Sequence, residues 1–176
     1  MEKGVEIIGF PSIKELQEYG LYPSEERFSR GPVVIVECVQ EIPCNPCEPA
    51  CNLGAIKIGE PITNVPRVNE ELCTGCGLCI AGCPGLAIFV VDKTHAPGLA
   101  AVSFPYEYEP LPEKGTEAEV VNRKGQVMGR GRIIRVVKTG KMDQTAVLTV
   151  VVPLELADEV RGIKRLQRGW SHGQGK

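Results

Sequence analysis

The sequence has little of what would indicate a catalyst or a membrane protein. Aromatic residues make up 5% of the chain, and its two histidines, His95 and His172, lie outside any motif and are expected at the surface. No Ser-His-Asp, paired-carboxylate or HExxH arrangement is present. The longest apolar run, Leu86 to Val91, is too short to span a bilayer, and the first residues lack the segments of a secretion signal. We therefore expect no membrane span, a cytoplasmic location and no catalysis by this chain alone.

Glycine and proline are abundant instead, with 20 and 14 residues, which predicts many turns and only short helices. The net charge of −2 is unevenly distributed. Residues 33–92 contain seven acidic and two basic residues, whereas residues 122–176 contain twelve basic and four acidic ones. We therefore expect two structural units with different surfaces. The basic region lacks an aromatic-rich or helix-turn-helix signature, which favours a partner-facing surface over nucleic-acid binding.

All eight cysteines lie between residues 33 and 92 and belong to an internal repeat. In a cytosolic chain thiols stay reduced, so clustered cysteines indicate metal ligands before disulfides. Both halves of the repeat have apolar residues before the cysteines and after them, which predicts strand, cluster loop, short helix and strand twice over. A shift of 32 residues superimposes Cys44, Cys47, Cys51, Ala55 and Ile56 on Cys76, Cys79, Cys83, Ala87 and Ile88.

The second half reads Cys73-Thr-Gly-Cys76-Gly-Leu-Cys79-Ile-Ala-Gly-Cys83-Pro84, which fits the C-x2-C-x2-C-x3-C-P run of bacterial iron–sulfur proteins at every position. Three thiolates at this spacing wrap one corner of a cubane cluster. The helix that follows carries the fourth thiolate away, toward a second cluster in a duplicated domain. Structural zinc sites usually come as two separated cysteine pairs, so the pattern favours iron over zinc.

The first half departs from this pattern. Its spacing is Cys38-x5-Cys44-x2-Cys47-x3-Cys51, with Asn52 where proline is usual. The loop of residues 39–43 must therefore bulge outward to return Cys38 to a cluster. The alternative is that Cys38 is a spare core thiol, which would leave a three-iron or labile cluster.

Residues 33–92 resemble the bacterial-type two-[4Fe–4S] ferredoxins, over about a third of the chain. The resemblance implies an α+β fold built on a pseudo-two-fold dicluster ferredoxin domain, which here carries an N-terminal helical arm and a C-terminal small antiparallel β module. It also implies two [4Fe–4S] clusters with separate ligand sets. These sets are Cys38, Cys44, Cys47 and Cys83 for cluster 1, and Cys51, Cys73, Cys76 and Cys79 for cluster 2.

Four further segments surround this domain. Residues 1–32 are expected to form an arm, with a capping box of Ser12 and Glu15. The proline-rich residues 93–116 predict a linker that packs against the rest. Residues 117–165 predict the β module, and residues 166–176 a tail in which Trp170 is interpreted as an anchor for a partner. Alternating valine and isoleucine predict three strands of the module, at Glu117–Asn122, Gln126–Val137 and Thr145–Val152.

The resemblance implies that the chain relays single electrons. The arm and the β module exceed what a free-standing ferredoxin needs, so a fixed subunit of a larger oxidoreductase is favoured over a free ferredoxin. The stretch from Glu41 to Pro49 also resembles small iron–sulfur subunits that accompany FAD-dependent dehydrogenases, which implies a flavoprotein partner in a hetero-oligomer. The rival from a different class is a nucleic-acid-binding protein with structural clusters.

Overall fold

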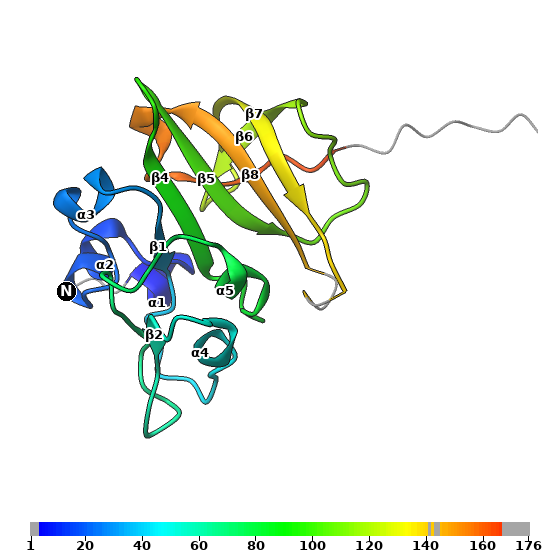
Figure 1. Ribbon diagram of the computed structural model, residues 1–176. Coiled ribbons are helices and arrows are strands. Elements are labelled where there is room, and N and C mark those ends of the chain that lie inside the picture. Colours follow the sequence, from blue (N-terminus) through cyan, green and yellow to red (C-terminus); the bar gives the residue numbers. More distant parts are fainter. Residues whose placement is uncertain (1–3, 141, 143–144, 167–176) are drawn as a thin grey trace, which may run out of the picture.

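The computed structural model describes residues 4–140, 142 and 145–166 and combines short helices with one large antiparallel sheet (Figure 1). The sheet has seven strands in the order β1-β4-β5-β8-β7-β6-β9, and a small second sheet pairs β2 with β3. The strands are β1 (Val33–Val36), β2 (Ile56–Lys57), β3 (Arg67–Val68), β4 (Ile88–Ala96), β5 (Leu99–Tyr106), β6 (Glu117–Asn122), β7 (Val127–Val137), β8 (Ala146–Pro153) and β9 (Val160–Ile163). The helices are α1 (Gly4–Ile8), α2 (Ile13–Glu18), α3 (Glu25–Ser29), α4 (Cys47–Ala50), α5 (Leu78–Ala81) and the 3-10 helix η1 (Leu154–Leu156).

The N-terminal arm folds into α1, α2 and α3 and packs against the rest of the chain. The predicted capping box is present, because Ser12 Oγ accepts the Glu15 N–H at 3.2 Å and Glu15 Oε2 accepts the Ser12 N–H at 2.8 Å. Leu16 and Phe28 are fully buried. Phe28 lies under the Lys93 ammonium of β4, with 4.1 Å between the Nζ atom and the ring centroid. The arm is therefore part of the same packed unit as the sheet.

The cysteine region has the order strand, helix, strand twice, as β1-α4-β2 and β3-α5-β4. The first and last of these strands pair with each other, with Val33 opposite Val91 and Val36 opposite Ile88. The two inner strands pair in the same antiparallel sense. All four residues of β1 are buried, which fits a strand covered on both faces.

The segment for which a linker is predicted, residues 93–116, contains the end of β4 and all of β5. On its two edges β5 pairs with β4 and with β8, so it joins the cysteine region to the β module within one sheet. Val102, Phe104 and Tyr106 point from β5 into the core and are nearly fully buried. One hydrophobic core consequently extends through both regions, and not two separate ones.

The β module contains the predicted strands with small shifts at their ends. The segment Glu117–Asn122 is β6, and the next two predicted strands correspond to β7 and β8. A further strand, β9, pairs with β6 and also lies against β5, so the sheet curls back on itself. No helix in the described part of the chain has the length and apolarity needed to cross a bilayer.

A buried ionic cluster joins the end of β1 to the β module. Glu37 accepts two hydrogen bonds from Arg123, at 2.9 and 2.5 Å, and one from Arg161 Nε at 2.6 Å. The three side chains are only 6%, 6% and 4% exposed. Arg123 comes from the turn after β6 and Arg161 from β9, so this Glu37 cluster connects residues that are distant in sequence.

Candidate metal centre

The eight cysteines gather in two groups of four, each around its own hollow. Each hollow combines three thiols from one half of the repeat with the last thiol of the other half. This is the grouping that a crossover of the fourth cysteine predicts. Hollow I, with about 330 Å³ of space including its open mouth, is lined by Cys51, Cys73, Cys76 and Cys79. Hollow II, with about 370 Å³ of space including its open mouth, is lined by Cys38, Cys44, Cys47 and Cys83.

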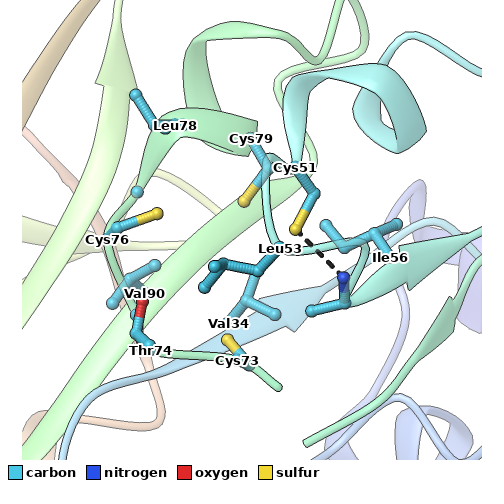
Figure 2. Close-up of a pocket in the computed structure, with 13 residues that line it drawn as sticks. Val34, Cys51, Leu53, Ile56, Cys73, Thr74, Cys76, Leu78, Cys79 and Val90 are labelled. Carbon is cyan, nitrogen blue, oxygen red and sulfur yellow. Dashed lines mark hydrogen bonds between the residues drawn. The ribbon is translucent and has the colours of Figure 1, made fainter.

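In hollow I the four sulfur atoms point toward a shared space (Figure 2). Cys79 sits on α5, while Cys73 and Cys76 lie on the loop before it. Two glycines in this loop adopt the left-handed conformation, with φ of 65° at Gly75 and 82° at Gly77. A Cβ at Gly75 would lie 2.6 Å from the side chain of Pro32, so only glycine fits there.

In hollow II the irregular spacing of the first motif is absorbed by the loop of residues 39–43, which contains no helix or strand. Cys38 lines the hollow together with the other three thiols, and its side chain is partly buried. The structure therefore places Cys38 in the group that the resemblance implies. Its binding to iron stays a prediction.

Each hollow has an equivalent backbone hydrogen bond to a cysteine sulfur. The Ala55 N–H donates to Cys51 Sγ at 3.2 Å, drawn as a dashed line in Figure 2, and the Ala87 N–H donates to Cys83 Sγ at 3.4 Å. These residues are equivalent in the internal repeat. N–H···S bonds of this kind stabilise negative charge on a thiolate and tune the potential of an iron–sulfur cluster.

Burial makes three of the thiols hard to ionise without a metal. It raises the pKa of Cys79 to about 12 and that of Cys47 to about 11. Burial also raises the pKa of Cys38, and in each hollow the neighbouring thiols act in the same direction. Metal binding requires thiolates and releases their protons, so cations in the hollows would remove an electrostatic penalty.

The donor sets of the hollows suit an iron–sulfur cluster. Four thiolates around a single zinc ion at about 2.3 Å would have their sulfurs only about 3.8 Å apart. Among the described residues, no three His, Cys, Asp or Glu side chains converge to hold one metal ion in this way. Each hollow instead offers four thiols, which is the ligand set of a [4Fe–4S] cluster.

One residue that organises hollow I is not evident from the sequence. Arg27 of α3 is 5% exposed, and its guanidinium donates to four backbone carbonyls. The shortest of these bonds, 2.7 Å, goes to the carbonyl of Cys73, and another of 3.0 Å goes to Pro32. Arg27 thus fixes the start of the cluster loop from outside the motif, where no local pattern reveals it.

The remaining candidate residues contribute nothing to the hollows within the described part of the chain. His95 is exposed on β4 and does not line either hollow, in agreement with its expected surface position. His172 and Trp170 fall outside the described residues.

Comparison with known proteins assigns the second half of the repeat. Residues 66–89 match the family described as 4Fe-4S binding domain. This part of the chain therefore forms a ferredoxin-type domain that binds a 4Fe–4S cluster. The match contains Cys73, Cys76, Cys79 and Cys83, whereas the first half of the repeat lies outside it.

Three curated relatives extend this comparison. The ferredoxin-type protein NapF of Escherichia coli K12 is 37% identical over 59 residues, covering 32% of this chain and 35% of its own. The polyferredoxin-like subunit of an aliphatic sulfonate oxidoreductase from Pyrococcus furiosus is 36% identical over 76 residues, covering 43% and 39%. One of the subunits of an ion-translocating oxidoreductase complex from Methanosarcina acetivorans is 49% identical over 47 residues, covering 27% and 17%.

These similarities are confined to part of each protein. The chain spans about a third of the length of NapF, the first of these relatives. No solved structure matches the chain significantly.

Proposed function

We propose that the chain is an electron-transfer protein that holds two [4Fe–4S] clusters, one in each hollow. The observation that carries this proposal is the sorting of eight thiols into two groups of four, with one thiol exchanged between the halves of the repeat. The pseudo-two-fold arrangement of a dicluster ferredoxin accounts for that exchange, because the cysteine after each helix reaches the other hollow.

In this proposal the clusters supply one-electron chemistry, and the chain supplies their surroundings. Three thiols from one half and one from the other would hold each cluster. The Ala55 and Ala87 N–H groups would donate to cluster-bound sulfurs, while the apolar walls of the hollows exclude water. Burial and hydrogen bonding to sulfur are the means by which a protein sets the potential of such a cluster.

We further propose that the chain works as a fixed subunit of a cytoplasmic oxidoreductase and exchanges electrons with an FAD-dependent dehydrogenase subunit. Two of the relatives are named as subunits of oxidoreductases, which supports a complex. The resemblance of the first motif to the small subunits of FAD-dependent dehydrogenases supports the flavoprotein. A reducing cytoplasm would also keep the thiols available for cluster assembly.

A reductive titration tests the relay. The protein is purified anaerobically and titrated with Ti(III) citrate, while visible absorbance and electron paramagnetic resonance are recorded. We expect two one-electron reductions per chain, with bleaching of the absorbance and signals of two reduced clusters. Uptake of one electron would leave one cluster only, and no uptake would refute electron transfer. An FAD-containing protein that co-purifies from the native source in fixed ratio would support the partner.

A further inference from the structure

A groove, separate from hollow II, adjoins hollow I on its outer side. This groove, with about 1200 Å³ of space including its open mouth, lies between the cluster loop with α5 and the β7–β8 hairpin. Figure 1 shows α5 beside β5 and β8, near the end of these strands where the β7–β8 hairpin lies. The helix α5 contacts both strands. One wall is formed by small residues, among them Gly77, Ala81 and Gly82, and the other wall includes Ser103 and Arg135.

Cys76 is the residue that connects the groove to the metal centre. It lines both hollow I and the groove. It is also the only exposed cysteine of the eight, all of which the structure describes. Electron transfer slows steeply with distance, so a redox centre seated in the groove would have its shortest path through this thiolate.

The other wall of the groove carries the positive charge of Arg135, which a register shift in β7 places there. Arg130 and Arg132 are exposed on β7, while Ile133 is buried, as strict alternation requires. A register shift between Ile133 and Arg135 then resets the alternation, so that Arg135 is exposed and Val136 packs against the core. Without this bulge, Arg135 would point inward. Bulges often serve to re-aim a side chain in this way.

Arg135 has no counter-ion within the described part of the chain. Its guanidinium makes no hydrogen bond and no ion pair there, whereas Lys138 pairs with Glu109 and Lys164 with Glu119. Leu78, which lines both the groove and hollow I, is 48% exposed, and Leu53, which lines hollow I, is 49% exposed. Apolar side chains next to an unpaired arginine are typical of an interface, in which arginine is enriched.

We propose that this groove is the docking face at which the cluster of hollow I exchanges electrons with a redox partner protein. The partner would present an acidic side chain to Arg135 and an apolar surface to Leu53 and Leu78. The inference rests on the proposed function, because it needs a cluster in hollow I. In each exchange the reduced cluster loses one electron and the partner's redox centre gains it, with no bond made or broken.

The charge part of the proposal is tested with inorganic one-electron oxidants that stand in for the partner. The reduced holo-protein is mixed with tris(oxalato)cobaltate(III), a trianion, or with hexaamminecobalt(III), a trication. Each Co(III) becomes Co(II) as one cluster loses one electron. The rates are measured by stopped flow at about 100 mM ionic strength, where the screening length of about 10 Å is shorter than the distance between the groove and the control site.

The test variant is Arg135→Glu and the matched control is Arg130→Glu. Arg130 is an exposed arginine of the same strand but lines other cavities, about 16 Å further along the strand. Reversing the charge at the groove should slow the anionic oxidant about tenfold and accelerate the cationic one by a similar factor. The control should change either rate less than about twofold.

Access is tested separately with Thr139→Trp, because Thr139 is an exposed residue that lines the groove. The bulky ring should slow both oxidants. Iron content and the two-electron uptake should stay unchanged in all three variants, which separates this inference from the proposed function. Equal effects of Arg135→Glu and Arg130→Glu, or unaltered rates in Thr139→Trp, would overturn the docking face while leaving the relay intact.

Discussion

Removing the carboxylate of the Glu37 cluster should strongly destabilise the protein. Glu37→Ala would leave the guanidinium of Arg161 buried without its counter-charge and that of Arg123 with only the half-exposed Glu159, 3.5 Å away, after the loss of three hydrogen bonds of 2.5–2.9 Å. Breaking a buried ionic cluster by deleting one partner costs about 3–5 kcal/mol. For a chain of this length the melting temperature should therefore fall by roughly 10 °C.

The matched control is Glu71→Ala. Glu71 also forms a two-pronged pair with an arginine, Arg30, but its side chain is 70% exposed. Removing an exposed pair of this kind should cost much less, because water screens the two charges. The isosteric Glu37→Gln keeps the shape and loses the charge, so its destabilisation should lie between those of the two alanine variants.

The assay is an anaerobic thermal scan that follows circular dichroism and the visible absorbance of the clusters. Iron content before heating shows whether each variant was assembled. A loss in Glu37→Ala no larger than that in Glu71→Ala would refute the reasoning, because the junction between β1 and the β module would then contribute little to stability.

Three more tests address other parts of the account. Cys83→Ser should remove the resonance signal of the hollow II cluster, whereas Cys79→Ser should remove that of hollow I; the reverse result would contradict the crossover. Gly75→Ala should lower cluster content and stability, because its Cβ has no room, whereas Gly98→Ala, with open space at a similar φ of 70°, should cost less. Hydrogen bonds from the Ser12 and Gly4 backbone lower the pKa of Glu15. The stability that ionised Glu15 contributes is thus fully present above its pKa in the unfolded chain, about 4.3. It is lost as the pH falls through the lower pKa of the folded chain. Glu15→Gln should flatten this acid limb of a melting-temperature profile, and an unchanged slope would contradict it.

The parts of the fold that could be predicted are those with a local pattern. The second cysteine motif has its ligands within eleven residues, so its spacing alone indicates a cluster. The strands β6 and β7 are marked by alternating valine and isoleucine and by a turn of Asn122 to Gly125 between them. The capping box of Ser12 and Glu15 is likewise contained in one helical turn.

The strand β5 is only partly evident in the sequence, because Phe104 and Tyr106 alternate as strand residues do but proline in a segment usually indicates a break. The pairing of β5 with β4 ends at Ser103, which lies opposite Val90, whereas its pairing with β8 continues to Tyr106. Pro105 is therefore tolerated in this strand. The edge facing β4 needs no N–H at that point. The short strand β9 has no comparable pattern of its own.

The buried charges could not be predicted, since their partners are remote in sequence. Glu37 is separated from Arg161 by 124 positions and Arg27 from Cys73 by 46. Only the folded chain brings these groups together, and a lone arginine or glutamate in a sequence is ordinarily a solvated surface residue.

The central claim is tested most directly by the iron and acid-labile sulfide content of the protein after anaerobic preparation with full cluster-assembly machinery. Two four-iron clusters predict a brown protein with about eight irons and eight sulfides per chain. A content of about four of each would leave one hollow without a cluster. Zinc in place of iron, with no sulfide, would contradict the account.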